Sequence, residues 1–108
     1  MTKLKIRLAR KQKYNNKPVT IDGIRFDSIK EGKSYNYLKS LEKTGQVLSF
    51  VRQKAFKLPG NIKYFCDFEV CWANGETTVE DVKGFKTQVY KIKKKIVEEL
   101  YNIKIIEF

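Results

Sequence analysis

Histidine is absent from the 108-residue sequence, and cysteine occurs only twice, with no CxxC pair. These absences exclude mechanisms that need imidazole, such as catalytic triads, histidine-metal nucleases and most catalytic zinc sites, and they also exclude zinc-finger architectures. No apolar stretch approaches the ~20 residues of a membrane helix, so we expect no membrane partner. No apolar segment follows the basic N-terminus, so the sequence predicts no secretory signal and a cytoplasmic protein with reduced cysteines.

Acidic residues are absent from residues 1–17, although the whole chain has 12 Asp and Glu against 23 Lys and Arg, a net charge of +11. A second lysine cluster falls on a predicted helix, where Lys91 and Lys95 are one turn apart. A basic arm and a basic helix predict a polyanionic partner, bound through phosphate contacts. The expected DNA-binding residues are Arg7, Arg10, Lys11, Lys13, Lys91 and Lys95. A solubilising tail and a solvated helix face would explain the same charges.

Length and composition predict one folded domain, because 42% of the residues are hydrophobic and 32% are charged. We expect a basic arm over residues 1–17 and the folded domain over residues 18–108. Periodicity and turn residues predict the following elements in that domain: a hairpin over 19–26, a helix over 28–43, strands over 47–58, 62–72 and 77–83, a helix over 87–100 and a strand over 103–108.

The order of these elements after the hairpin is αβββαβ. The first three strands are expected to form an antiparallel meander, and the last strand is expected to lie parallel to the third through a right-handed crossover. The predicted fold class is therefore α/β (α+β), with one mixed four-stranded sheet and helices packed on it. The second helix has an apolar stripe along one side, formed by Val89, Ile92, Ile96 and Leu100.

Four polar side chains interrupt the apolar pattern. Asp67 lies within an apolar strand, and Asp81 and Lys83 are two residues apart on the next strand, so their side chains share a face. Glu31 lies on the apolar stripe of the first helix and is expected to point toward the sheet. Buried carboxylates need a positive partner, which a hard cation such as Mg²⁺ supplies. A lysine beside them can orient water or stabilise charge on a phosphate, so the set is typical of metal-assisted phosphodiester hydrolysis.

Whether Asp67 and Asp81 meet depends on the hairpin that joins their strands. A two-residue turn pairs positions whose numbers sum to 149, which moves Asp81 to the other face and leaves Glu80 as the substitute acid. A three-residue loop with Gly75 in the left-handed conformation gives a sum of 148 and places Asp67 directly opposite Asp81. We predict the second register, in which Phe68 lies opposite Glu80.

Each candidate also has a purely structural interpretation. Glu31 has the spacing of a capping box at the helix start, and this alone would explain it. Asp67 and Lys83 fit a cross-strand ion pair, and Asp81 fits a solvated strand end. Gln53, in an apolar strand, either fixes a ligand or water or is a satisfied buried amide.

The order and spacing of four motifs resemble the PD-(D/E)XK nuclease superfamily, and more closely a small phage-encoded family of unknown function. The motifs are FDSIKE at 26–31, Gln53, YFCDF at 64–68 and VEDVKG at 79–84. The resemblance runs from Tyr14 to the C-terminus. One departure is Cys66, which stands where the superfamily often has proline.

This resemblance implies that Glu31, Asp67 and Asp81 are metal ligands and that Lys83 is the catalytic lysine, with Gln53 and Glu80 in supporting roles. It implies Mg²⁺ or Mn²⁺, no organic cofactor and a DNA substrate. We therefore expect a metal-dependent DNA endonuclease. By analogy, branched DNA such as a Holliday junction in phage recombination is the expected substrate, which a homodimer would cut in the host cytoplasm. The alternatives are a non-catalytic DNA-binding protein with a nuclease-like fold and a structural protein whose acids form surface ion pairs.

Overall fold

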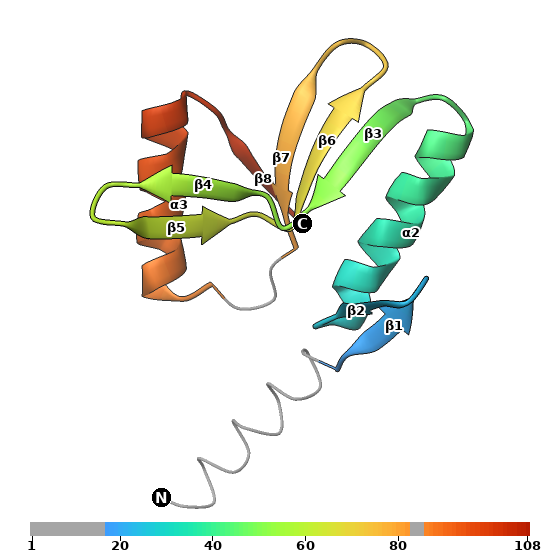
Figure 1. Ribbon diagram of the computed structural model, residues 1–108, viewed down its shortest axis with the longest axis horizontal. Helices are drawn as coiled ribbons and strands as arrows, with labels where there is room; N and C mark the ends of the chain where they lie inside the picture. Colours follow the sequence, from blue (N-terminus) through green and yellow to red (C-terminus); the bar gives the residue numbers. More distant parts are fainter. Residues whose placement is uncertain (1–16, 83–85) are drawn as a thin grey trace, which may run out of the picture. The chain divides into compact units, whose positions relative to one another are not determined.

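The computed structural model describes residues 17–82 and 86–108 (Figure 1). These residues form an α+β fold with two helices and a mixed four-stranded sheet, as the sequence predicts. They form two compact units, and the division falls within α2, between Tyr37 and Leu38. Neither helix of the described ranges is long and apolar enough to cross a membrane. The expected basic arm lies outside the described residues, apart from Lys17.

The first unit contains the predicted hairpin, formed by β1 (Val19–Ile21) and β2 (Ile24–Phe26), and the first part of α2 (Ile29–Lys43). Asp22 and Gly23 turn the hairpin with φ angles of 54° and 75°, the left-handed conformation that an Asp-Gly pair tolerates.

The helix lies close against this hairpin because position 32 is a glycine. A Cβ atom at Gly32 would meet a side-chain carbon of Val19 at 2.8 Å, so a larger residue could not fit without displacement. The Tyr35 hydroxyl donates a 2.9 Å hydrogen bond to Asp22, and its ring packs on Phe26 with centroids 5.0 Å apart. The Asp22–Gly23 turn, Gly32 and Tyr35 together hold the start of α2 against the hairpin.

The second unit is organised around a sheet with the strand order β3-β6-β7-β8. Its strands are β3 (Val47–Arg52), β6 (Phe68–Trp72), β7 (Thr77–Asp81) and β8 (Ile105–Glu107). β6 is antiparallel to both β3 and β7, and β8 is parallel to β7. The expected meander and the parallel pairing through a helix are therefore confirmed.

The long strands expected over 47–58 and 62–72 are each interrupted, which corrects the prediction. The chain forms β3 and then β4 (Ala55–Leu58), returns as β5 (Ile62–Phe65) and continues as β6; β4 and β5 pair as a separate two-stranded sheet. The residue numbers of each cross-strand pair sum to 120 both in β3–β6, from Ser49 onward, and in β4–β5. The pairing register is therefore the same on both sides of the interruption, and only the backbone bends there. Gln53, with φ of 53°, produces this bend opposite Asp67.

The hairpin between β6 and β7 has the predicted register. Phe68 pairs with Glu80 and Val70 with Thr78, so partner numbers sum to 148. Gly75 has φ of 94°, and its N–H donates to the Trp72 carbonyl at 3.0 Å, which closes the three-residue loop. The length of this loop therefore sets which face each acid occupies.

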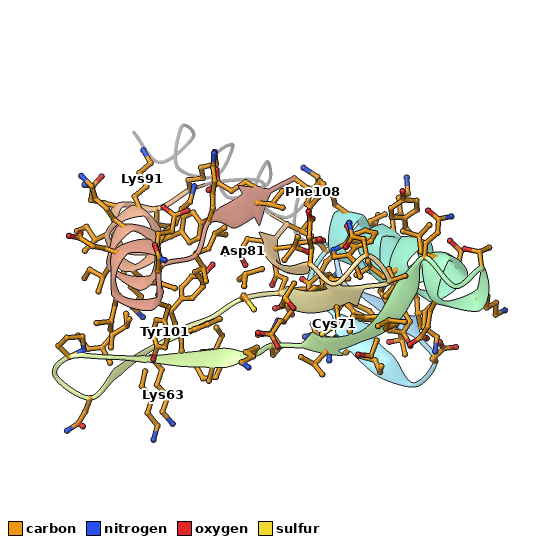
Figure 2. The ribbon with its side chains drawn as sticks, turned by 90° about the horizontal axis from the view of Figure 1, so that it is seen from above. Lys63, Cys71, Asp81, Lys91, Tyr101 and Phe108 are labelled. Atoms are coloured by element: carbon orange, nitrogen blue, oxygen red, sulfur yellow. The ribbon has the colours of Figure 1, made fainter. Side chains whose placement is uncertain are left out.

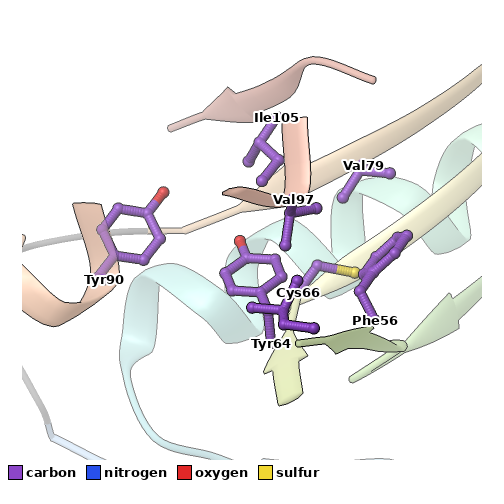
Figure 3. Close-up of a cluster of buried hydrophobic side chains, with 8 residues drawn as sticks. Phe56, Tyr64, Cys66, Val79, Tyr90, Val97 and Ile105 are labelled. Atoms are coloured by element: carbon purple, nitrogen blue, oxygen red, sulfur yellow. The ribbon is translucent and has the colours of Figure 1, made fainter. Parts of the chain in front are cut away.

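The helix α3 (Gln88–Tyr101) connects β7 to β8 and packs against the β4–β5 hairpin. Thr87 caps its start by accepting from the Tyr90 N–H at 3.0 Å. The core beneath it gathers side chains from the helix, the sheet and the hairpin (Figure 3), namely Phe56, Leu58, Tyr64, Cys66, Val79, Tyr90, Val97 and Ile105. The helix enters this core through Tyr90 and Val97, not through the apolar stripe recognised in the sequence, whose four residues are exposed.

Candidate functional site

Asp67 and Asp81 lie side by side where two neighbouring strands of the sheet reach their ends. Asp67 directly precedes β6, and Asp81 is the last residue of β7. The Asp67 N–H is 3.1 Å from the Glu80 carbonyl and 3.0 Å from Oδ1 of Asp81. Asp81, labelled in Figure 2, is fully buried, and Asp67 is 9% exposed. The register of the hairpin thus brings two acidic side chains to one point.

The carboxylate of Asp67 is fixed by two further hydrogen bonds. The Val82 N–H donates to Oδ2 at 2.7 Å, and Nε2 of Gln53 donates to Oδ1 at 3.3 Å. Gln53 also donates its backbone N–H to the Asp67 carbonyl at 3.1 Å, so the bend in the sheet holds both parts of Asp67. Each of these carboxylate oxygens keeps a second lone pair, which is available to a ligand. Gln53 therefore positions the acid through its amide.

The donor set suits a hard divalent cation. Mg²⁺ is commonly bound by one or two carboxylates together with water and substrate phosphates, so Asp67 and Asp81 are sufficient protein ligands. The described ranges contain no group of three or more Asp, Glu, Cys or His side chains placed to hold a metal. The two aspartates are thus a pair of neighbouring acids at this end of the sheet, and a metal bound by them belongs to the proposal below.

Glu31 occupies the first turn of α2, in the first unit, whereas both aspartates belong to the second. Its side chain is buried, with 8% exposure, which agrees with the inward orientation expected from its place on the apolar stripe. Its backbone N–H donates to Oγ of Ser28 at 3.1 Å, so Ser28 caps the start of the helix. The convergence of Glu31 with the aspartates stays a prediction.

Five of the expected functional residues fall outside the described ranges. They are the lysine of the EDVKG motif and the basic residues of the arm, namely Lys83, Arg7, Arg10, Lys11 and Lys13.

Glu80 occupies the other face of the hairpin, opposite Phe68. The observed register therefore removes the reason for naming it as a substitute acid. It is buried, and Oγ1 of Thr78 donates to its Oε2 at 2.9 Å. Burial raises the pKa of the Glu80 carboxyl above its usual value. Glu80 is therefore a buried side chain that is hydrogen-bonded to Thr78 within the hairpin.

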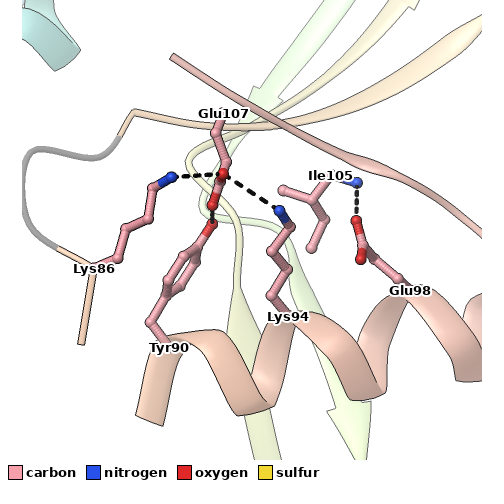
Figure 4. A network of polar contacts seen from close by, with 6 residues as sticks. All are labelled: Lys86, Tyr90, Lys94, Glu98, Ile105 and Glu107. Atoms are coloured by element: carbon pink, nitrogen blue, oxygen red, sulfur yellow. Dashed lines mark hydrogen bonds and ion pairs between the residues drawn. The ribbon is translucent and has the colours of Figure 1, made fainter. Parts of the chain in front are cut away.

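A basic depression of about 300 Å³ lies between α3 and β8, and the exposed Lys91 and Lys95 line it. Its complete lining is Lys86, Lys91, Lys94, Lys95, Glu98 and Glu107. Four ammonium groups and two carboxylates leave a local charge of +2. The carboxylate of Glu98 accepts the Ile105 N–H at 2.8 Å (Figure 4), so it is already engaged by the backbone. The depression is therefore suited to an anion such as a phosphate.

Glu107 is the centre of this depression (Figure 4). The Tyr90 hydroxyl donates to it at 2.6 Å, and Nζ of Lys86 and Nζ of Lys94 lie 2.9 and 3.4 Å from its Oε1. The Tyr90 hydrogen bond and the two lysines lower the pKa of Glu107 to about 2. Burial, the Glu107 hydrogen bond and the nearby Asp81 charge raise the pKa of Tyr90 well above its usual value. Glu107 therefore keeps its charge and holds two lysines in place.

Glu107 was not among the predicted site residues, although the sequence contains a signal for it. The parallel pairing places Glu107 opposite Asp81, on the adjoining strand. In the segment IKIIEF, Ile105 and Glu107 alternate with outward residues, and an acid next to the site strand was therefore foreseeable once the last strand was placed beside the third.

A search of curated proteins finds no match to this chain. A family model described as protein of unknown function (DUF1064) matches residues 11–106. That range includes the aspartate pair and both helices, and it ends within β8, one residue before Glu107. The chain therefore belongs to the DUF1064 family.

Proposed function

We propose that the protein is a metal-dependent DNA endonuclease that hydrolyses phosphodiester bonds. The observation that supports this proposal most directly is the pairing of Asp67 with Asp81, with Oδ1 of Asp81 3.0 Å from the Asp67 N–H. A fold without a catalytic role has little reason to bury two carboxylates together, because neighbouring buried charges of one sign destabilise the folded state.

In this proposal Asp67 and Asp81 bind Mg²⁺ or Mn²⁺, and the role of Glu31 rests on the sequence resemblance alone. The bound cation supplies Lewis-acid stabilisation of charge that develops on the phosphate. Val82 and Gln53 hold the Asp67 carboxylate in one orientation through their hydrogen bonds. The role proposed for Lys83 comes from its motif: it orients the attacking water or stabilises the negative charge of the phosphate.

The basic depression and the arm bind the DNA backbone. Lys91 and Lys95 contribute phosphate contacts on α3, and Glu107 holds Lys86 and Lys94 at the same depression. Such contacts carry affinity without base recognition and make binding steeply dependent on salt. The net charge of +11 supports the same class of partner.

Branched DNA is the proposed substrate, in recombination of phage DNA in the host cytoplasm. Recognition of DNA shape fits a surface of phosphate contacts, because such contacts carry no base information. Symmetric cutting of a Holliday junction requires two active sites related by a two-fold axis, and therefore a homodimer. The substrate and the dimer rest on analogy with the superfamily.

The test compares the wild-type chain with Asp81→Asn and Glu76→Gln on a four-way junction and on linear duplex, with Mg²⁺, with Mn²⁺ and with EDTA. Glu76 is exposed in the loop region of the same hairpin and serves as the matched control for loss of an acid. We expect metal-dependent cleavage by the wild type and by Glu76→Gln, and a loss of at least about 100-fold in Asp81→Asn.

The alternative function is DNA binding without catalysis on a nuclease-like fold. It predicts that the wild type and Asp81→Asn bind the junction equally and that neither cuts it with any metal. Cleavage that survives in both Asp81→Asn and Asp67→Asn would also contradict the proposed site.

A further inference from the structure

The basic depression between α3 and β8 adjoins the aspartate pair. Asp81 and Glu107 lie directly opposite each other in the parallel pairing of β7 with β8, so their Cα atoms are about 4.8 Å apart. The pairing continues beyond them, because the Phe108 N–H donates to the Asp81 carbonyl at 2.9 Å. Asp81 is a proposed metal ligand, and Glu107 lines the depression. The two sites are therefore neighbours across one pair of strands.

Both side chains continue the face of the sheet that α3 covers. Val79 and Ile105 precede them by two residues on their strands, and both belong to the core beneath the helix. The Tyr90 hydroxyl donates to Oε2 of Glu107 at 2.6 Å (Figure 4). Burial and this bond raise the pKa of Tyr90, and the charge of Asp81 and a hydrogen bond to it add to the rise. One hydroxyl thus connects the depression with a residue of the aspartate pair.

The lysines of the depression have donors to spare for an anion. Nζ of Lys86 and Nζ of Lys94 lie 2.9 and 3.4 Å from Oε1 of Glu107, so this carboxylate holds both ammonium groups beside β8. An ammonium group has three donors, and the contact with Glu107 engages one of them in each lysine. Lys91 and Lys95 form no ion pair with the described residues, which leaves their charges to a ligand.

The size and charge of the depression suit one phosphate group. Its volume of about 300 Å³ equals that of roughly ten water molecules at about 30 Å³ each, which is enough for a phosphate with its hydration water. The local charge of +2 exceeds the single negative charge of a phosphate diester. Because Glu107 orders two of the lysines beforehand, binding costs less side-chain entropy. Glu107 is therefore a positioning residue of this site.

We propose that the depression binds one particular phosphate of the substrate, the phosphate that flanks the cleaved bond on the same strand. This inference rests on the proposed function and names the part of the DNA that the depression receives. Successive phosphates of a strand advance about 3.4 Å along the helix axis, so a site one sheet strand away is reached about one or two nucleotides from the bond. The phosphates of the complementary strand lie across a groove of about 6 or 12 Å, which is wider than the spacing of neighbouring sheet strands.

The test measures kcat/KM for cleavage of a four-way junction in Mg²⁺ by the full chain, after the position of the cut has been mapped. In a series of substrates, one phosphate at a time is replaced by a neutral methylphosphonate, on either side of the cut and at the same positions of the complementary strand. The protein variants are Lys94→Gln and Lys86→Gln in the depression. Lys63→Gln, at an exposed lysine of β5 in the same unit, is the matched control for the loss of one charge.

We expect one methylphosphonate on the cut strand, about one or two nucleotides from the bond, to lower the wild-type kcat/KM about tenfold. Lys94→Gln should lower kcat/KM of the unmodified junction about tenfold, mainly through a higher KM, and that methylphosphonate should then have little further effect. Lys63→Gln should keep the wild-type kcat/KM and the full effect of the methylphosphonate. Glu107→Gln should raise KM and leave kcat within about twofold, as a positioning role requires.

Thermal unfolding by circular dichroism shows whether each variant is folded. If Lys94→Gln does not fold, Lys86→Gln carries the same comparison, because it removes the other ammonium group that Glu107 holds.

Cleavage by the wild type with equal losses at every methylphosphonate would overturn the inference and leave the nuclease in place, because the depression would then be a diffuse basic surface. Losses confined to the complementary strand would overturn it as well. The same holds if the effects of Lys94→Gln and of the methylphosphonate multiply, since the lysine would then contact another group. A wild type that cuts no DNA with any metal would instead refute the proposed function, and this inference with it.

Discussion

The backbone N–H of Asp67 lies 3.0 Å from Oδ1 of Asp81, and the same N–H is 3.1 Å from the Glu80 carbonyl. One donor therefore ties the start of β6 both to the backbone and to the acidic side chain at the end of β7. The donor of this contact is a backbone group, which every substitution at position 67 except proline retains. Oδ1 of Asp81 accepts this backbone N–H, whereas the two oxygens of Asp67 accept from Val82 and Gln53. Substitution of either acid by asparagine should therefore change the stability of the fold differently.

Asp81→Asn and Asp67→Asn are expected to shift stability in opposite directions when no metal is present. Asparagine at position 81 keeps an oxygen to accept the Asp67 N–H and removes a fully buried charge, so we expect a gain of about 1 kcal/mol. Asparagine at position 67 weakens the charge-assisted bond from Val82 and turns an N–H group toward one of its two donors, at a cost of about 1 kcal/mol.

Urea unfolding without and with Mn²⁺ measures both effects. The wild type should gain about 2.7 kcal/mol at a Mn²⁺ concentration of 100 times its Kd, and both variants should lose this gain. If Asp81→Asn were instead destabilised without metal and kept its response to Mn²⁺, Asp81 would act as part of a structural ion pair.

Glu80→Gln provides the contrasting case on the other face of the hairpin. Burial raises the folded-state pKa of Glu80, so its ionisation destabilises the protein as the pH rises through that pKa. The glutamine oxygen can still accept from Thr78, and the variant should therefore be more stable than the wild type at pH 7 but not at pH 4. Its response to Mn²⁺ should equal that of the wild type. A loss of that response would place Glu80 in the metal site.

The register was predicted correctly, although the turn residues are compatible with both possibilities. Gly75 is left-handed in a two-residue Asn-Gly turn and in the three-residue loop alike, and the two turns differ at Asn74, whose φ is positive only in the two-residue turn. In the structure Gly75 has φ of 94° and Asn74 is not among the residues of positive φ. The carboxylates of Asp67 and Asp81 had a reason to share a face, and this agreed with the local turn chemistry. Agreement between two levels of structure made the prediction specific.

The bend at Gln53 was not predictable from periodicity. Apolar residues continue at every second position from Ile62 to Trp72, and the pairing register is unchanged across the bend. A period of two reports which face a residue occupies and is insensitive to a single residue in the left-handed conformation. The apolar stripe of α3 does not mark the buried face of the helix for a related reason. A pattern shows that a face is apolar but not that another element covers it.

Glu107→Gln should destabilise the protein at neutral pH by about 1–2 kcal/mol, since the carboxylate accepts from Tyr90 and pairs with two lysines. The folded-state pKa of about 2 lies below the ordinary value of 4.5, so this contribution is complete above pH 4.5 and is lost as the pH falls toward 2. Thermal unfolding between pH 7 and pH 2 should therefore show a smaller decrease for the variant than for the wild type.

Glu42→Gln is the matched control for this measurement. Glu42 pairs with Lys39 at 3.7 Å on the exposed surface of α2, and the loss of that pair should change stability by less than about 0.5 kcal/mol. Equal effects of the two substitutions would mean that Glu107 is no more than a surface ion pair. The junction affinity of Glu107→Gln should also fall, because Lys86 and Lys94 lose the group that holds them.

The thiol of Cys66 should be unreactive in the folded protein. Cys66 is fully buried among Tyr64, Val79 and Phe56, and burial raises its pKa to about 11. At pH 8 about one molecule in a thousand then carries the reactive thiolate. In a Cys71→Ser variant, which leaves one thiol, labelling by Ellman's reagent should be slow in buffer and complete within the mixing time in guanidinium chloride.

The rate in buffer also reports how firmly the hairpin closes over the core. Cys66 donates its N–H to the Lys54 carbonyl at 3.0 Å, at the bend that connects the β4–β5 hairpin to the sheet. If the hairpin opened without global unfolding, Cys66 would label faster than urea unfolding predicts. Labelling at the rate set by global unfolding instead requires the hairpin, α3 and the sheet to open together. A Cys66→Ser variant, which leaves the half-buried Cys71, gives the reference rate for a thiol outside this core.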